Sequence, residues 1–154
     1  MKRSIFILMW AGFSILSVHA QTGYPVNPVP FTSVKVKQDS FWGQRLRAAR
    51  EVTVPLAFSK CESEGRYRNF VQCQHPSDDY APTKFPFDDT DVYKTIEGAS
   101  YILQTYPDAK LEAYIDSVLA IVGAAQEPDG YLYTNRTIGG TLHPWAGEKR
   151  WEKD

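Results

Sequence analysis

The sequence predicts an all-α fold, because apolar residues recur at helical spacing in three stretches while only one short stretch alternates as a strand does. The two clearest stretches are residues 92–106 and 111–125 of the 154-residue chain. In each, apolar side chains fall three or four positions apart, which places them on one face of a helix. The pair predicts a helical hairpin with its turn at Pro107 and Asp108.

A proline-containing turn is expected to end the hairpin. Pro128 disfavours helical geometry in the residue before it, so the second helix should stop near residues 126–127. Asp129 and Gly130 then predict a tight turn. An aromatic loop at residues 131–133 follows.

A third helix is predicted to begin at Phe41, with Asp39 or Ser40 as its cap. Pro55 should kink or divide this helix, and Gly65 marks its end. Three arginines between residues 45 and 50 form either a solvated, ion-paired face or a surface that recognises sugar or phosphate.

The first twenty residues have the pattern of a secretory signal peptide. Lys2 and Arg3 precede an apolar run from residue 5 to residue 18, and small residues surround Ala20. The run is shorter than the roughly 20 residues that span a bilayer. We therefore expect an exported protein, periplasmic or extracellular, that begins near Gln21 and has no membrane partner after cleavage; a retained membrane anchor is the alternative.

Two segments of the chain lack a helical pattern. Residues 21–32 are rich in proline and predict an extended lead-in, and Val34 and Val36 alternate with polar residues as in a short strand at residues 33–37. Residues 66–86 show no clear period and predict a loop of about twenty residues, a length typical of functional or disordered segments. The last residues, 148–154, are expected to begin another helix.

Composition excludes some classes of partner. Without Lys2 and Arg3 the chain has 15 basic and 18 acidic side chains. This balance gives no clustered basic field, so we expect no nucleic-acid partner. The aromatic content of 14% suits either a helical core or the stacking platforms of a sugar-binding cleft.

Cysteine and histidine are too sparse to predict a metal site. Cys61 and Cys73 are either a disulfide, as an exported protein allows, or two free thiols. Cys73 and His75 alone do not make a zinc site, which needs three or four ligands. His143 precedes a proline and is expected to be simply exposed.

An acidic cluster at the start of the first hairpin helix is the best candidate site. It consists of Asp88, Asp89 and Asp91. Such residues suit the positive end of a helix, where Asp89 or Thr90 can cap it. Carboxylates also serve as acid, base and hydroxyl acceptor in glycoside cleavage. We predict Asp89 and Asp91 as substrate-binding residues.

Three separated motifs resemble a known family. The first spans residues 40–70 and opens with SFWG, the second reads FDDTDVYK at 87–94 with EGAS at 97–100, and the third reads AQEPDGYLYT at 125–134. Residues 145–147 and 150–152 also fit. In this order the motifs resemble the opening of glycoside hydrolase family 127, the β-L-arabinofuranosidase family.

The resemblance implies a fold and a chemistry. It implies that residues 33–154 are the N-terminal part of an (α/α)6 toroid, whose short N-terminal strand pairs with a β-sandwich. The expected activity is hydrolysis of L-arabinofuranosides in plant-type oligosaccharides or polysaccharides. The family uses a zinc-bound cysteine nucleophile and a glutamate acid/base, which lie in its middle section, so no catalytic or metal residue is assigned to Cys61, Cys73 or any other position here.

Length also indicates a truncated toroid. Twelve helices of about eleven residues with loops of about five need roughly 190 residues, so the chain alone is expected to be inactive. Two alternatives stay open at this point: another (α/α)6 carbohydrate-active enzyme, and a non-catalytic helical glycan-binding module.

Overall fold

A computed structural model describes residues 26–152, and every regular element in that range is helical. This confirms the all-α prediction. The elements are the 3₁₀ helix η1 (Phe31–Ser33), α1 (Phe41–Ala48), the π-helical segment η2 (Ala49–Thr53), α2 (Val54–Ser63), α3 (Arg66–Gln74), α4 (Asp89–Thr105), α5 (Ala109–Ala124) and α6 (Thr134–Thr137).

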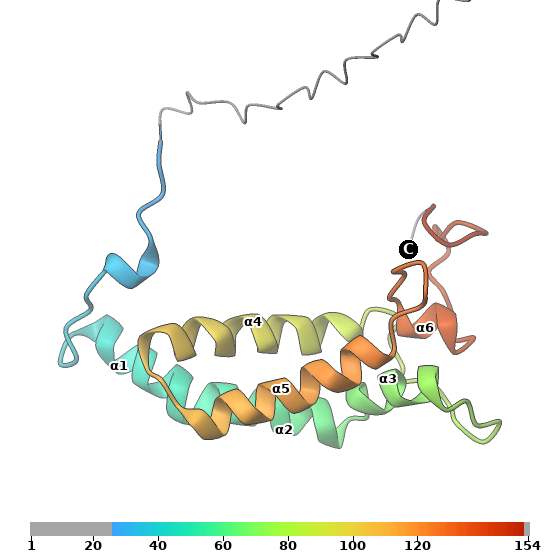
Figure 1. Cartoon of the computed structure of the whole chain (residues 1–154), viewed down its shortest axis with the longest axis horizontal. Coiled ribbons are helices and arrows are strands. Elements are labelled where there is room, and N and C mark those ends of the chain that lie inside the picture. The colour runs from blue at the N-terminus through green and yellow to red at the C-terminus, as the bar shows by residue number, and fades with distance from the viewer. Residues whose placement is uncertain (1–25, 153–154) are drawn as a thin grey trace, which may run out of the picture.

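Helices α4 and α5 form the antiparallel hairpin that the sequence predicts, and they pack against α2 and α3 (Figure 1). Asp108 caps α5, since its Oδ1 accepts hydrogen bonds from the N–H groups of Lys110 (3.0 Å) and Leu111 (3.2 Å). The start of α4 lies at the same end of the molecule as α3 and α6 (Figure 1).

Two neighbouring apolar clusters fill the space between the helices. One gathers Phe70 of α3, Val92 of α4 and Val118 of α5, and the other gathers Phe58 of α2 with Ala99 and Ile115 of the hairpin. Phe70 and Val92 have no exposed surface. The core therefore fixes the start of α4 relative to α3.

The long N-terminal helix is divided as predicted. Ser40 caps α1, because its Oγ accepts a 3.1 Å hydrogen bond from the N–H of Gly43. Pro55 lies in the first turn of α2, where its missing N–H is tolerated, and the π-helical segment before it absorbs the change of register. Gly65 ends α2 with a left-handed φ of 81°, a conformation that favours glycine.

The predicted loop at residues 66–86 is wrong in its first half, which is helix α3. Two turns of helix are too short to give a clear period, although Tyr67, Phe70 and Val71 have helical spacing. Asn69 of α3 holds the rest of the loop against this helix through two hydrogen bonds. Its Nδ2 donates to Thr83 Oγ1 at 2.7 Å, and its Oδ1 accepts from the Tyr80 hydroxyl at 2.6 Å.

The ends of the chain differ from the predictions. Residues 34–37 have no regular structure after η1, and no strand occurs anywhere in residues 26–152. The strand predicted at residues 33–37 would form only beside a partner strand, so its pairing with a β-sandwich stays a prediction. A bend at residues 148–149 and a turn at residues 150–152 occupy the stretch where a helix was expected. The predicted signal peptide, residues 1–20, and residues 21–25 of the lead-in lie outside the described residues. Residues 26–30 of the lead-in have no regular structure, and residues 31–32, expected to be extended, belong to η1.

Within the described part of the chain, no helix combines the length and the apolar character that crossing a membrane requires.

Candidate functional site

A buried carboxylate joins the two sequence motifs at 87–94 and 125–134. Asp89 is the first residue of α4, and Thr134 is the first residue of α6. The Thr134 N–H donates to Asp89 Oδ2 at 2.8 Å, and the Thr134 hydroxyl donates to Asp89 Oδ1 at 2.5 Å. The two residues are 5% and 1% exposed. Asp89 therefore holds the start of α4 against the loop that follows α5.

The two hydrogen bonds from Thr134 to Asp89 take the place of the N-terminal cap that the sequence predicts for α4. Asp89 directs both oxygens to Thr134, and the Thr90 hydroxyl donates to the carbonyl of Phe87 at 2.9 Å. Asp88 occupies the cap position, but its Oδ2 accepts from the N–H of Phe85, outside the helix. No side chain caps α4, so the capping prediction for Asp89 and Thr90 is wrong.

Burial raises the pKa of Asp89 above the ordinary value of 3.8. The hydrogen bonds from Thr134 oppose the shift, because they stabilise the ionised form, and the neighbouring Asp88 adds to it. The carboxyl group therefore retains its proton to a higher pH than an exposed aspartate.

Asp91 lies in a different environment from Asp89. Arg66 Nη2 lies 3.3 Å from Asp91 Oδ2 and 3.4 Å from Asp88 Oδ1, and Lys94 Nζ lies 3.2 Å from Asp91 Oδ1. Asp91 lines a pocket of about 250 Å³ beside Cys61. The structure therefore places the two predicted substrate-binding carboxylates in separate pockets.

Asp89 borders a larger cavity of about 640 Å³, which we call the aromatic cavity. Its wall combines aromatic faces, phenol hydroxyls and two carboxylates. The lining residues are Pro86, Phe87, Asp89, Thr90, Tyr93, Gly130, Tyr131, Leu132, Tyr133, His143, Trp145, Trp151 and Glu152. They come from the start of α4, the turn after α5 and the C-terminal segment.

Tyr93 also lines this cavity. Its hydroxyl oxygen is buried and has no hydrogen-bond partner among the described residues. Burial raises the pKa of Tyr93, with Asp89 and Cys73 adding to the effect. The hydroxyl therefore keeps its proton and is a hydrogen-bond donor.

The turn at residues 127–130 holds the C-terminal segment over the cavity. Glu127 Oε1 accepts from the Thr137 hydroxyl at 2.7 Å and from Arg150 Nη2 at 2.9 Å. Asp129 Oδ2 accepts from Trp151 Nε1–H at 3.2 Å. The Gly130 N–H donates to the Glu127 carbonyl at 2.8 Å, and its φ is 90°, which confirms the predicted tight turn.

Sequence reasoning missed the role of His143. Rather than standing exposed, its ring is half-buried and stacks between Phe87, with centroids 5.8 Å apart, and Trp145, with centroids 4.0 Å apart. The sequence signal was slight, because an HPW tripeptide among glycines resembles an ordinary loop.

Both cysteines are free thiols, so the disulfide alternative is wrong. Burial raises the pKa of Cys61, and it raises the pKa of Cys73 to about 11. Neither thiol is a thiolate at neutral pH. Among residues 26–152, no three His, Cys, Asp or Glu side chains are placed to hold a metal ion, so this part of the chain does not fit the zinc that the family resemblance implies.

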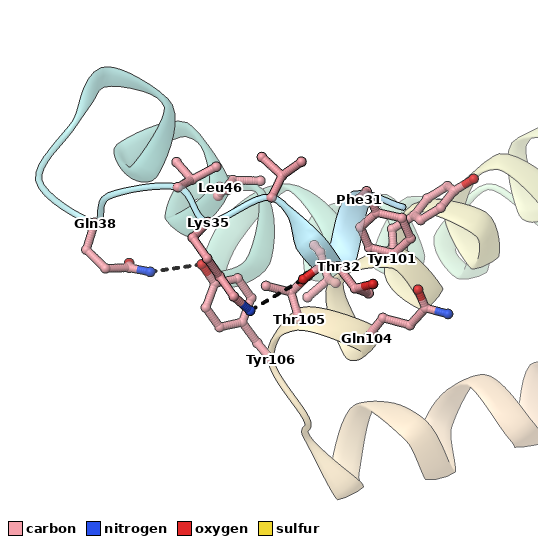
Figure 2. Close-up of a pocket in the computed structure, with 12 residues that line it drawn as sticks. Phe31, Thr32, Lys35, Gln38, Leu46, Tyr101, Gln104, Thr105 and Tyr106 are labelled. Carbon is pink, nitrogen blue, oxygen red and sulfur yellow. Dashed lines mark hydrogen bonds between the residues drawn. The ribbon is translucent and has the colours of Figure 1, made fainter. Parts of the chain in front are cut away.

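A second cavity, of about 540 Å³, lies at the opposite end of α4 (Figure 2). The N-terminal segment around Phe31 and Lys35 covers it, and Gln38 Nε2 donates to the Tyr106 hydroxyl at 3.0 Å. Its lining is mostly apolar and includes no carboxylate. It therefore lacks the paired carboxylates that glycoside cleavage uses.

The arginines of the N-terminal helix make contacts that are typical of a solvent-exposed protein surface. The guanidinium of Arg45 lies 4.8 Å from the ring centroid of Phe41, and that of Arg50 lies 5.1 Å from the ring of Tyr106. Arg50 also lies 3.9 Å from Glu51. These contacts favour the solvated, ion-paired interpretation.

Comparison with known proteins gives one consistent family. Residues 33–153 match the model of the β-L-arabinofuranosidase GH127 catalytic domain. A solved structure described as a GH127 β-arabinofuranosidase is 70% identical, with a TM-score of 0.76 over 85% of this chain and 21% of the other. A GH127 β-L-arabinofuranosidase from Geobacillus stearothermophilus T6 is 32% identical, with a TM-score of 0.61 over 65% of this chain and 17% of the other.

A sequence relative agrees with these structures. The non-reducing end β-L-arabinofuranosidase of Bifidobacterium longum subsp. longum is 41% identical over 64 residues, which are 42% of this chain and 9% of that protein. The chain thus spans at most about a fifth of the length of these relatives. The family match covers most of the described residues, and the chain belongs to the GH127 β-L-arabinofuranosidase catalytic-domain family, a family of glycoside hydrolases.

Proposed function

We propose that this chain supplies one wall of the substrate cleft in a glycoside hydrolase that acts on L-arabinofuranosides of plant-type glycans. One observation carries the proposal: two separate motifs meet through Asp89 and Thr134, which lie 45 positions apart, and the aromatic cavity opens where they meet. The similarity to β-L-arabinofuranosidases supports the choice of sugar.

The cavity wall suits a sugar. A sugar ring presents C–H groups on its faces and hydroxyls on its edge, so it is bound best by aromatic faces combined with a few hydrogen-bonding groups. The aromatic cavity offers the rings of Trp145 and Phe87 together with the carboxylates of Asp89 and Glu152.

Asp89 and Asp91 have different parts in this proposal. Asp89 borders the aromatic cavity, and we propose that it binds substrate there, directly or by holding Thr134 in place. Asp91 reaches substrate only through the smaller pocket, where Arg66 and Lys94 already pair with it. Asp89 is therefore the stronger of the two candidates.

The reaction itself needs residues other than those described. Cys61 and Cys73 are neutral thiols, and the described residues offer no zinc site. We therefore expect that the 154-residue polypeptide alone does not hydrolyse arabinofuranosides, and that this portion binds and positions the glycan.

A chimaera tests the proposal. Residues 33–152 would replace the equivalent segment of the GH127 β-arabinofuranosidase that is 70% identical. We expect the chimaera to hydrolyse 4-nitrophenyl β-L-arabinofuranoside within about tenfold of the parent enzyme, while the 154-residue chain shows no turnover. A correctly folded chimaera without activity would contradict the proposal.

Glycan binding without catalysis is the second candidate function, and it is favoured by the fact that residues of this chain alone form the aromatic cavity. Binding of an arabinofuranosyl oligosaccharide to the chain, together with an inactive chimaera, would select it.

We also propose that the protein is exported. The support is the pattern of Lys2, Arg3 and the apolar run at residues 5–18. N-terminal sequencing of the protein recovered from the periplasm of a bacterial host should begin near Gln21. A periplasmic fraction without the protein would count against export.

A further inference from the structure

Four aromatic rings lie in a row beside the aromatic cavity. Phe85 stacks on Phe87 with centroids 5.3 Å apart, Phe87 stacks on His143 at 5.8 Å, and His143 stacks on Trp145 at 4.0 Å. The planes of successive rings differ by 16°, 8° and 13°. Contact between aromatic faces is favourable for each pair. We call these four side chains the aromatic ladder.

The two ends of the ladder differ. At one end, the ammonium group of Lys84 lies 5.1 Å from the ring centroid of Phe85. At the other end, Trp145 is 62% exposed, and His143 is the one ring that contacts it among the described residues. Because His143 covers one face of the indole, we take the exposed surface to be mainly the opposite face, which we call the open face.

Trp145 lines the aromatic cavity together with the ring of Tyr93 and the carboxylates of Asp89 and Glu152. A volume of about 640 Å³ also lies within the range of pockets that hold ligands larger than a single sugar. The cavity thus has a platform, hydrogen-bonding groups and room for more than one sugar unit.

We propose that the open face of Trp145 is a stacking platform for a second sugar unit of an arabinofuranosyl oligosaccharide. The proposal rests on the proposed function, because it assumes a glycan in the same cavity. The ladder fixes the indole before the sugar arrives. A side chain that is already ordered loses little conformational entropy on binding, and this improves affinity.

Nuclear magnetic resonance tests the platform, with the ¹⁵N-labelled chain carrying Val52→Lys and Leu56→Lys on the exposed apolar face of the α1–α2 helix to prevent self-association. The indole N–H signals of Trp42, Trp145 and Trp151 are followed while an L-arabinofuranosyl disaccharide, or L-arabinose alone, is added. We expect a saturable shift of the Trp145 signal with the disaccharide and a smaller one with arabinose. Trp42, which is 67% exposed on α1, is the internal control and should not move.

Substitutions give the matched comparison. Trp145→Ala should weaken disaccharide binding about tenfold, equivalent to about 1.4 kcal/mol, whereas Trp145→Phe should keep part of the affinity and Trp42→Ala all of it. An unmoved Trp145 signal in the folded chain that keeps Trp145, or equal affinity of the Trp145→Ala variant, would overturn the platform.

The two proposals fail separately. If the chimaera is active but the Trp145 signal of the chain does not shift with the disaccharide, the platform is ruled out and the hydrolase assignment stands. A saturable Trp145 shift in the chain with an inactive chimaera would support the platform and remove the hydrolase assignment.

Discussion

Asp89 is the residue on which the candidate site depends most. It is almost fully buried, and its two oxygens accept both available hydrogen bonds from Thr134. The sequence marks Asp89 as a site residue, but its partner could not be predicted, because Thr134 lies 45 positions away and only the packing of α3, α4 and α6 brings the two together.

Loss of the Asp89 carboxylate should destabilise the protein. Asp89→Ala leaves the buried N–H of Thr134 unpaired, so we expect the free energy of unfolding to fall by about 3 kcal/mol. Asp89→Asn can still accept one hydrogen bond and donate another, so it should lower the free energy of unfolding by only about 1 kcal/mol. Asp91→Asn, with a partly exposed ion pair, should cost under about 1 kcal/mol. Urea denaturation measures all three, and equal losses for Asp89→Ala and Asp91→Asn would contradict a structural role of the Thr134 contact.

The raised pKa of Asp89 predicts a pH dependence. The unfolded chain releases this proton near pH 3.8, and the folded chain releases it at a higher pH. Between these two pH values the folded state binds more protons, so the contribution of Asp89 to the free energy of unfolding falls as the pH rises. The advantage of the wild type over Asp89→Asn should therefore be greatest below pH 3.8 and smaller at neutral pH. An advantage that grows with pH in urea denaturation would show that the pKa is lowered instead.

At the scale of elements, the sequence predicts those helices that have long periodic stretches and those turns that contain proline or glycine. The hairpin of α4 and α5, the division near Pro55 and the turn at Gly130 all follow from local signals. Helix α3 could not be predicted from its period, because two turns contain too few apolar positions. The cap of α4 was predicted wrongly, because a tertiary hydrogen bond to Thr134 competes with the local one.

A glycine at the start of α1 offers a test at this scale. A Cβ on Gly43 would overlap the carbonyl oxygen of Lys37 and lie 2.6 Å from that of Gln38. Gly43→Ala should therefore cost about 1–3 kcal/mol of unfolding free energy. Gly123→Ala is the matched control: nothing lies within 4 Å of its Cβ position in α5, and the change should stabilise by about 0.5–1 kcal/mol. A loss for both variants in chemical denaturation would contradict the close approach at Gly43.

At the scale of the molecule, the helices leave much apolar surface uncovered. Along the α1–α2 helix, Phe41, Trp42, Val52 and Leu56 are 55% to 67% exposed. Patches of this kind mark surfaces that contact other protein. The sequence shows that these residues are apolar, but not which of them the fold covers.

This surface should make the 154-residue chain associate and bind hydrophobic dyes. Sedimentation velocity should show concentration-dependent oligomers, and an anilinonaphthalene sulfonate dye should fluoresce strongly in its presence. The double substitution Val52→Lys and Leu56→Lys should reduce both effects while leaving the unfolding free energy nearly unchanged, since both side chains are more than half exposed. A monomer that binds no dye would contradict the prediction.

A crystal structure of the chimaera with an unhydrolysed arabinofuranosyl disaccharide analogue tests the central claim most directly. We expect electron density for the sugar in the aromatic cavity, within hydrogen-bonding distance of Asp89 or Glu152 and against the open face of Trp145. An analogue bound elsewhere in the enzyme, with solvent alone in the aromatic cavity, would contradict the assignment of this cavity as the substrate site.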